Sequence, residues 1–435
     1  METKVIAIAG LNASGKTQLV EKMRREAKSD SVRYVAFCDT YGTATDRSYY
    51  LQQRWNQHDI DEETPRVAQA LERSFNLSGP DTPERRQLQA QLYELMGMEA
   101  LLDKYVISLS SGELRKMQLV KTLMARPQTL ILDNPFIGLD TEARAMLAQQ
   151  LRKLKEQGMT LYLVVARPNE IPDFADDIIW TTPEEEFRLQ PQAADSVAAL
   201  SPCAAASFPC RNGAEGEAST IIEFHNVSIR YGERTILKPL SWTVHEGEHW
   251  ALSGRNGSGK STLLSLICAD NPQSYACDIT LFGRQRGSGE SIWDIKRRIG
   301  YVSPEMHRSY QRNLPALHIV ASGLKDTVGL YVRPNEAERQ QCLDCMRRFG
   351  IDHLASRSFL HLSSGEQRMV LVARAFVKDP ALLILDEPMH GLDLQRQQLV
   401  KELIEDYCRR PDRTLIMVTH YEEELPRCIT HRLCL

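Results

Sequence analysis

Gly254-Arg255-Asn256-Gly257-Ser258-Gly259-Lys260-Ser261 follows the pattern G-x-x-x-x-G-K-[ST] of a phosphate-binding loop. The apolar residues 250–252 before it predict a buried strand, and residues 262–267 after it predict a helix. Glycines let backbone N–H groups approach phosphate oxygens, and a helix N-terminus adds partial positive charge. The expected phosphate-binding residues are therefore Gly254, Asn256, Gly257, Ser258, Gly259, Lys260, Ser261 and Thr262. We also expect the Ser261 hydroxyl to bind Mg²⁺.

A second phosphate-binding loop is predicted near the N-terminus, at Gly10-Leu11-Asn12-Ala13-Ser14-Gly15-Lys16-Thr17. It also follows an apolar run, residues 5–9, that predicts a strand. Its expected phosphate-binding residues are Gly10, Asn12, Ala13, Ser14, Gly15, Lys16, Thr17 and Gln18. Thr17 is also expected to bind Mg²⁺. Two such loops in one chain indicate an internal repeat.

Two further motifs recur at equal spacing in the two halves. Ser-Ser-Gly-Glu occurs at 110–113 and at 363–366, where it predicts the start of a helix. Apolar strands predicted at 130–133 and 382–386 end in Asp133 and Asp386, and each aspartate lies 22 positions after the second serine of its half. The fold class is therefore α/β, with two phosphate-loop NTPase domains, each a mainly parallel sheet core with a helical subdomain.

The repeat sets the expected domain boundaries. The first domain is predicted at 1–181 and the second at 221–435, each of a size usual for one domain. Residues 182–220 are rich in Ala, Ser and Pro and predict a flexible linker. Few residues precede Gly10, so we expect the first domain to be short at its N-terminus and to lack the strand pair that opens the second.

Charge and hydropathy exclude several classes of protein. A net charge of -4 gives no basic excess, so nucleic acid is not an expected partner. No apolar run approaches the ~18 residues that span a bilayer, and we expect no direct membrane insertion and no signal peptide. The ten cysteines are scattered without the spacing of a zinc site, which predicts free thiols in a reducing cytosol.

The motifs together resemble those of the ATP-binding cassette ATPases. These are Leu-Ser-Ser-Gly-Glu, the apolar strand ending in aspartate 22 positions later, and Gly391-Leu392-Asp393. The resemblance implies two cassettes packed head to tail within one monomeric chain. Each Mg²⁺-ATP would lie between the phosphate loop of one cassette and the signature turn of the other, Ser111-Gly112 or Ser364-Gly365. Each signature turn also has the sequence of a helix cap, and one turn can both cap a helix and contact a nucleotide.

The resemblance also implies catalytic roles in the second half. Asp386 would hold Mg²⁺, Glu387 would act as general base toward water, and His420 would contact the γ-phosphate. Tyr231 would stack on adenine. In the first half Asp133 keeps the metal position, but Asn134 and Arg167 replace the base and the histidine. We therefore expect the site of the first half to bind nucleotide and hydrolyse it poorly, since an amide cannot take a proton from water.

Within this family, tandem cassettes without membrane spans serve either transport or translation on the ribosome. The Ala/Ser/Pro-rich linker lacks the charge of the long helical linkers typical of the ribosomal group. The chain is more similar to the tandem ATP-binding proteins associated with molybdenum transport. That similarity implies an integral membrane transporter subunit as partner and a cytoplasmic location at the inner face of the membrane. A translation factor and a regulatory ATP switch without transport partner are the alternatives.

Overall fold

A computed structural model describes residues 4–10, 31–36, 65–106, 109, 111–136, 139, 141–165, 170–182, 185–190, 219–231, 234–255, 257–304, 306, 310, 313–327 and 333–435. For residues 10, 111, 141, 181–182, 185–190, 231 and 234 it describes the backbone alone. Contacts divide the chain into two compact units, unit 1 (Met1–Ala199) and unit 2 (Leu200–Leu435).

Unit 1 is built on a sheet with the strand order β2-β3-β4-β1-β5-β6. Strands β1 to β5 run parallel, and β6 pairs antiparallel with β5 at one edge. The strands are β1 (Val5–Gly10), β2 (Val32–Ala36), β3 (Thr129–Asp133), β4 (Thr160–Val164), β5 (Asp177–Thr182) and β6 (Glu185–Gln190). Strand β6 lies inside 182–220, where composition predicts a linker, because a stretch of alternating polar and apolar residues, 185–190, precedes the Ala-rich segment.

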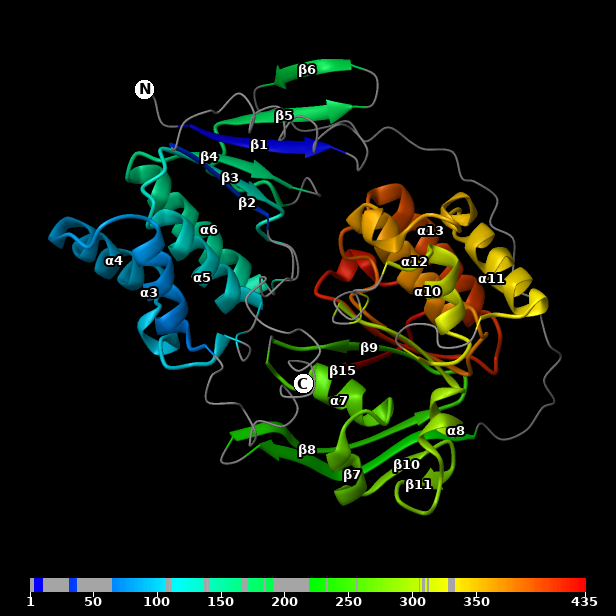
Figure 1. The fold of residues 1–435 in the computed structure, drawn as a ribbon. Coiled ribbons are helices and arrows are strands. Elements are labelled where there is room, and N and C mark those ends of the chain that lie inside the picture. Colours follow the sequence, from blue (N-terminus) through cyan, green and yellow to red (C-terminus); the bar gives the residue numbers. More distant parts are fainter. Residues whose placement is uncertain are drawn as a thin grey trace. The chain divides into compact units, whose positions relative to one another are not determined.

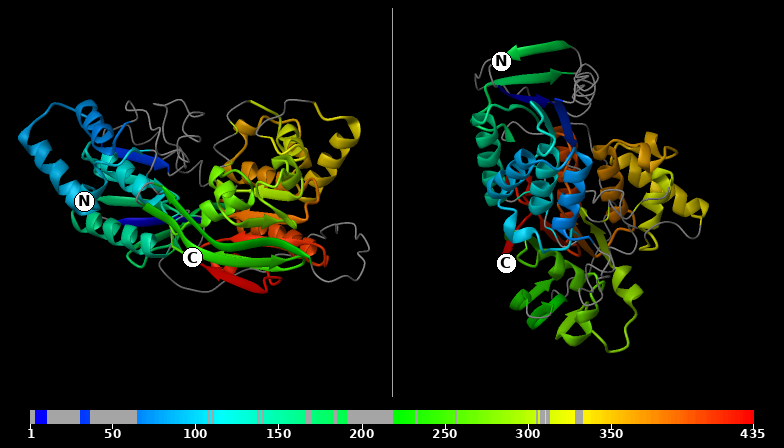
Figure 2. Two further views of the ribbon diagram at one scale, coloured as in Figure 1. Left: turned by 90° about the horizontal axis from the view of Figure 1, so that it is seen from below. Right: turned by 60° about the vertical axis from the view of Figure 1, so that its left-hand side comes forward.

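The described helices of unit 1 lie together on one side of this sheet (Figure 1 and Figure 2). They are α3 (Val67–Leu77), α4 (Pro83–Met96), the short η2 (Glu99–Leu101), α5 (Ser111–Leu123) and α6 (Thr141–Glu156). Local chemistry sets the ends of α4: Thr82 caps its first turn, and Gly97 ends it with a left-handed φ of 61°. Apolar side chains of these helices and of the sheet form one continuous core.

Unit 2 contains a parallel sheet with the order β12-β13-β14-β9-β15 and an antiparallel sheet with the order β11-β10-β7-β8. The parallel strands are β9 (His249–Ser253), β12 (Ile299–Val302), β13 (Leu382–Asp386), β14 (Thr414–Val418) and β15 (His431–Cys434). The antiparallel strands are β7 (Thr220–Tyr231), β8 (Arg234–His245), β10 (Ile279–Leu281) and β11 (Arg284–Gln285).

The helices of unit 2 fall into two groups. Helix α7 lies between the two sheets and shares a core with both (Figure 1). The helical group α10 to α13 packs around a second core that reaches the parallel sheet. The described elements are α7 (Lys260–Ile267), η5 (Pro272–Ala276), α8 (Ile292–Lys296), α10 (Ala316–Ser322), α11 (Glu336–Arg348), η6 (Asp352–Leu354), η7 (Phe359–His361), α12 (Ser364–Phe376), α13 (Leu394–Cys408) and η8 (Glu422–Glu424).

The two parallel sheets share one topology. In each, the strand before the phosphate loop (β1 or β9) lies between the strand that follows the last large helix (β4 or β14) and the last parallel strand (β5 or β15). This equivalence confirms the predicted α/β class with duplicated, mainly parallel cores. Only unit 2 has an antiparallel sheet among the described residues.

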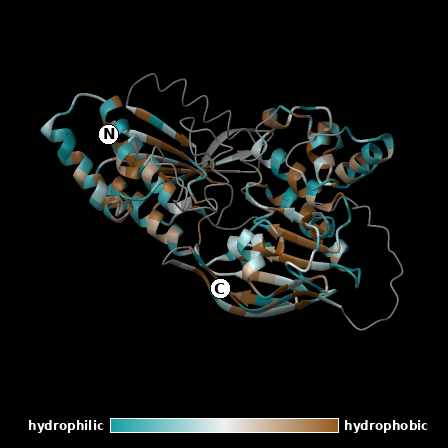
Figure 3. Ribbon diagram, turned by 60° about the horizontal axis from the view of Figure 1, so that its bottom comes forward, coloured by the Kyte–Doolittle hydropathy of each residue, from teal (hydrophilic) through white to brown (hydrophobic). Residues whose placement is uncertain are grey.

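Hydropathy follows this layering. Figure 3 shows hydrophobic residues concentrated along the core strands and hydrophilic residues on the outer sides of the helices. Within the described ranges, none of the helices has the length and apolar character to cross a membrane.

Candidate functional site

The residues predicted for catalysis in unit 2 come from neighbouring strand ends. Strand β9 pairs in parallel with β14, and β14 pairs in parallel with β13. The carboxyl ends of parallel strands share one edge of a sheet. The phosphate loop after β9, Asp386 at the end of β13 and His420 after β14 therefore meet at that edge.

Glycines of the phosphate loop serve two different purposes. Gly254 (φ 145°) and Gly259 (φ 98°) face backbone, and a Cβ there would lie 2.7 Å from the Leu435 oxygen and 2.8 Å from the Ile236 oxygen, respectively. These two glycines allow close packing of the loop. Gly257 (φ 84°) is exposed, and a Cβ at this position would have no neighbour within 4 Å. Its backbone is therefore open to an incoming ligand.

Polar side chains of this loop are poised for an anion. Lys260 Nζ donates hydrogen bonds to the backbone oxygens of Gly254 (2.5 Å) and Arg255 (2.9 Å). Ser258 Oγ is buried without a hydrogen-bond partner, an unfavourable state for a hydroxyl. Ser261 is exposed at the start of α7, whereas Thr262 is buried. The other predicted nucleotide residues of unit 2 lie outside the described part: Asn256 entirely, and Tyr231 in its side chain.

Glu387 is a buried carboxyl at the strand edge. It adopts a left-handed φ of 51°, which costs a non-glycine residue about 1–2 kcal/mol. Its Oε1 is buried without a hydrogen bond and lies 3.7 Å from His420 Nε2. Burial raises the pKa of Glu387 well above its ordinary value, the carboxylates of Glu424 and Asp386 raise it further, and the charges of Arg368 and Lys260 oppose them.

Arg368 of α12 holds the turn that carries Glu387. This guanidinium is 4% exposed and donates to the backbone oxygens of Pro388 (3.2 Å), Ser303 (3.1 Å), Asp386 (2.8 Å) and Glu387. A buried cation needs such oxygen acceptors, because each N–H group left without one loses its hydration at a cost. Arg368 therefore fixes the peptide units on both sides of the predicted base.

These residues fit a magnesium–nucleotide complex. Carboxylates of Asp386, Glu387 and Glu424 gather at one strand edge with buried, unsatisfied polar atoms. Hard oxygen donors of this kind are the ligands that Mg²⁺ prefers. Asp386 and the Ser261 hydroxyl would hold the ion, and Lys260 with the open loop backbone would hold the phosphates.

The signature turns begin helices in both units. In unit 2 the cap is Ser363, whose Oγ accepts from the Glu366 backbone N–H (3.3 Å) while Glu366 accepts from the Ser363 N–H (2.8 Å). Ser364 is exposed at the first helical position, and Gly365 is buried. Because Ser363 does the capping, Ser364 remains accessible for another role. In unit 1, Ser111-Gly112 likewise begins α5.

The end of β3 in unit 1 has the backbone conformation of the end of β13 in unit 2 but carries different side chains. Asn134 has a φ of 52° and its N–H donates to the Val164 oxygen (2.8 Å), as Glu387 (φ 51°) donates to Val418 (2.9 Å). The Asn134 amide donates to Asp133 Oδ1 (2.9 Å), and the Tyr34 hydroxyl donates to Asp133 Oδ2 (2.8 Å). Residues 11–18 of the first phosphate loop and Arg167 lie outside the described residues.

Sequence reasoning missed two residues of this site. Glu424 is 2% exposed and its Oε2 accepts from the Thr419 hydroxyl, yet it belongs to a run of three glutamates that reads as solvated surface. The burial of Arg368 could have been predicted from the repeat, because Arg368 lies four positions after Ser364 as Arg115 lies four positions after Ser111. Arg115 is equally buried and donates to the Pro135 oxygen (3.1 Å).

Comparisons with known proteins find similar sequences over most of the chain. The family model described as ABC transporter matches residues 1–137 and 237–390. The ABC transporter ATP-binding protein ModF of Escherichia coli (strain K12) is 42% identical over 360 residues, covering 79% of this chain and 73% of that protein. An uncharacterised ABC transporter ATP-binding protein of Schizosaccharomyces pombe is 28% identical over 419 residues, covering 94% of this chain and 84% of that one.

A solved structure extends the likeness to both units. An archaeal ribosome recycling factor, solved in complex with a ribosomal stalk protein, matches with a TM-score of 0.54 and 16% identity. The match covers 100% of this chain and 83% of that one. At this identity the likeness concerns the fold alone, and it confirms the two-domain α/β class.

Because the Glu387 carboxyl is buried, we predict that it lowers the free energy of unfolding by an amount that depends on pH. Its folded pKa lies above its unfolded value, so the folded state binds more protons and the free energy of unfolding falls as pH rises from about 4.3 through the folded pKa. Glu387→Gln removes this loss. We expect the melting temperature of the variant to exceed that of the wild type without nucleotide, by a margin that widens between pH 5 and 8.5.

Differential scanning fluorimetry across that range measures the margin. Glu422→Gln is the control, because the Glu422 side chain is 81% exposed and its substitution should leave no widening gap. A margin that stays constant or narrows with rising pH would contradict the burial argument.

Proposed function

Because the chain belongs to the ABC transporter family and is an ABC-type ATPase, we propose that it hydrolyses ATP at unit 2 to drive or regulate a membrane transporter. The observation that carries this proposal is the buried carboxyl of Glu387 at the strand edge that also holds Lys260 and His420. Burial raises the pKa of this carboxyl, and a carboxylate with a raised pKa holds a proton taken from water more tightly.

In the proposed reaction the chain's own residues position water and accept its proton. Glu387 Oε1 takes the proton of a water that attacks the γ-phosphorus, while the bond from that phosphorus to the bridging oxygen breaks and ADP leaves. His420 beside Glu387 orients the phosphate. Lys260 moves from the loop oxygens to the β- and γ-phosphates. Mg²⁺, when bound, would neutralise charge on the phosphate oxygens.

We further propose that the two nucleotide sites are unequal and shared between units. The competent site would combine Lys260, Asp386, Glu387 and His420 with signature Ser111-Gly112. The other would combine Lys16, Thr17 and Asp133 with signature Ser364-Gly365. Asn134 supports this inequality, since its amide lacks a basic group and is engaged with Asp133.

Glu387→Gln tests the general base. We expect kcat for ATP hydrolysis to fall about 10²–10⁴-fold while ATP affinity persists, because an amide cannot accept the proton. Phosphate release and equilibrium binding of a fluorescent ATP analogue measure the two effects. Asn134→Gln, at the equivalent strand end, should leave turnover within about twofold. Wild-type turnover in Glu387→Gln would refute the assignment.

Arginine substitutions in the signature turns test both the sharing and the inequality. Ser111→Arg places a bulky cation at the turn that would complete the competent site, and we expect it to lower turnover by about 10-fold or more. Ser364→Arg, the matched variant, should weaken retention of a non-hydrolysed nucleotide and reduce turnover less. Filter binding after rapid desalting measures the retained ATP. An equal loss of turnover in both variants would contradict unequal sites.

A membrane transporter subunit is the proposed partner, at the cytoplasmic face. The printed name of the 42% identical relative, an ABC transporter ATP-binding protein, supports transport. The resemblance to molybdenum-associated tandem cassettes makes molybdate the proposed cargo. Cells lacking the chain should take up less radioactive molybdate, with uptake restored by the wild type but not by Glu387→Gln. Sulfate uptake is the control. Unchanged molybdate uptake together with ATP-dependent co-sedimentation with ribosomes would favour the translation alternative.

A further inference from the structure

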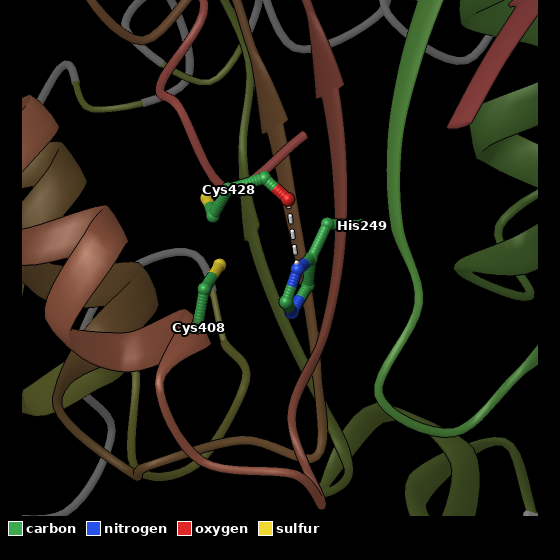
Figure 4. A group of neighbouring side chains, drawn as sticks. All are labelled: His249, Cys408 and Cys428. Atoms are coloured by element: carbon green, nitrogen blue, oxygen red, sulfur yellow. Dashed lines mark hydrogen bonds between the residues drawn. The ribbon is translucent and has the colours of Figure 1, made fainter. Parts of the chain in front are cut away.

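Three potential metal ligands meet in unit 2, away from the nucleotide residues. They are His249 at the start of β9, Cys408 at the end of α13 and Cys428 in the segment before β15 (Figure 4). One ligand atom of each lies within 4.8 Å of the other two. His249 and Cys408 are buried, and Cys428 is partly buried. Both cysteines are free thiols.

The imidazole of His249 faces more acceptors than its neutral form can satisfy. Its Nδ1 lies 3.1 Å from the Cys428 backbone oxygen, and its Nε2 lies 3.2 Å from the Arg413 backbone oxygen. A neutral imidazole has one N–H donor and one lone pair. In the neutral ring, one nitrogen therefore directs its lone pair at a carbonyl oxygen.

The surroundings of the two thiols favour positive charge. Cys408 is the last residue of α13, where the helix dipole carries its negative end. Glu405 accepts a hydrogen bond from the backbone N–H of Arg427, the residue before Cys428, so its carboxylate lies beside the cluster. The nearby cations Arg410 and Arg413 are both paired with Asp379.

We propose that His249, Cys408 and Cys428 bind a single Zn²⁺ ion that serves a structural role. Two thiolates and an imidazole are donors that zinc takes readily. Tetrahedral zinc sets such atoms about 3.5–3.8 Å apart, so inward movements of the side chains complete the site once the Cys428 backbone oxygen withdraws from His249 Nδ1. Nδ1 of His249 would ligate the ion while Nε2–H keeps its bond to the Arg413 oxygen, the usual arrangement for a metal-bound histidine. Water would take the fourth position from the partly exposed side of Cys428.

The ion would join three elements at the end of the sheet opposite the nucleotide. Strands β9, β14 and β15 are parallel, so His249 marks their amino edge and Ser253 their carboxyl edge, about 13 Å apart at 3.3 Å per residue. Bound zinc would fix the end of α13 and the segment leading to β15 against β9. Its effect is therefore expected on stability, with turnover unchanged.

Metal analysis of the whole chain tests this site. The protein is purified with a non-histidine affinity tag and without chelators, and then measured by inductively coupled plasma mass spectrometry. We expect about one Zn²⁺ per chain. Cys408→Ser and Cys428→Ser should each lower this at least about fivefold, whereas Cys277→Ser, a partly buried cysteine elsewhere, should not. Chelation should lower the melting temperature of the wild type and of Cys277→Ser, but not that of Cys408→Ser or Cys428→Ser.

A second measurement does not depend on the folding of the variants. Cd²⁺ added to chelated, reduced wild-type protein should produce ultraviolet thiolate-to-metal absorption that saturates at about one equivalent. Absence of that absorption, zinc retained in both serine variants, copper found in place of zinc, or a Cys408–Cys428 disulfide in protein purified under reducing conditions would each overturn the proposal.

Discussion

The strand edge of unit 2 that carries Asp386 and Glu387 depends on the buried guanidinium of Arg368. Four backbone oxygens from two separate segments of the chain converge on it: Ser303 after β12, and the consecutive Asp386, Glu387 and Pro388 at the end of β13. A buried Arg is costly without acceptors, and these acceptors are available only if the chain turns sharply after Asp386. The same interaction therefore satisfies the cation and holds Glu387 in its left-handed conformation.

The equivalent turn in unit 1 shows which features of the turn belong to the fold and which belong to Glu387 alone. Arg115 is buried there as Arg368 is, and Asn134 has nearly the φ of Glu387. Asn is among the side chains that tolerate this region of φ best, while Glu is not. The turn is therefore a property of the fold, and Glu387 occupies it at a conformational cost. Strain retained at one of two equivalent positions is the pattern expected of a functional residue.

Sequence reasoning succeeded where the structure is encoded locally. The phosphate loop carries its own strand, glycines and helix within a short segment, so 254–262 and the ends of β13 and α12 could be predicted from residue types and spacing. It failed where distant segments meet. Composition alone did not indicate the pairing of β6 with β5, the burial of Glu424, or the approach of Cys408 and Cys428 to His249. The spacing of cysteines along the sequence cannot reveal potential zinc ligands that come together only when the sheet folds.

The burial of Glu387 also bears on the order of events in the proposed cycle. In the chain without nucleotide, desolvation and two neighbouring carboxylates raise the pKa of the Glu387 carboxyl. Lys260 is meanwhile held by two loop oxygens of its own segment. A magnesium ion held by Asp386 and Ser261 would lower the pKa of adjacent carboxyls, because an added positive charge favours their ionised form. Nucleotide binding would therefore oppose the effect of burial on the pKa of Glu387, and this links the two by electrostatics at one strand edge.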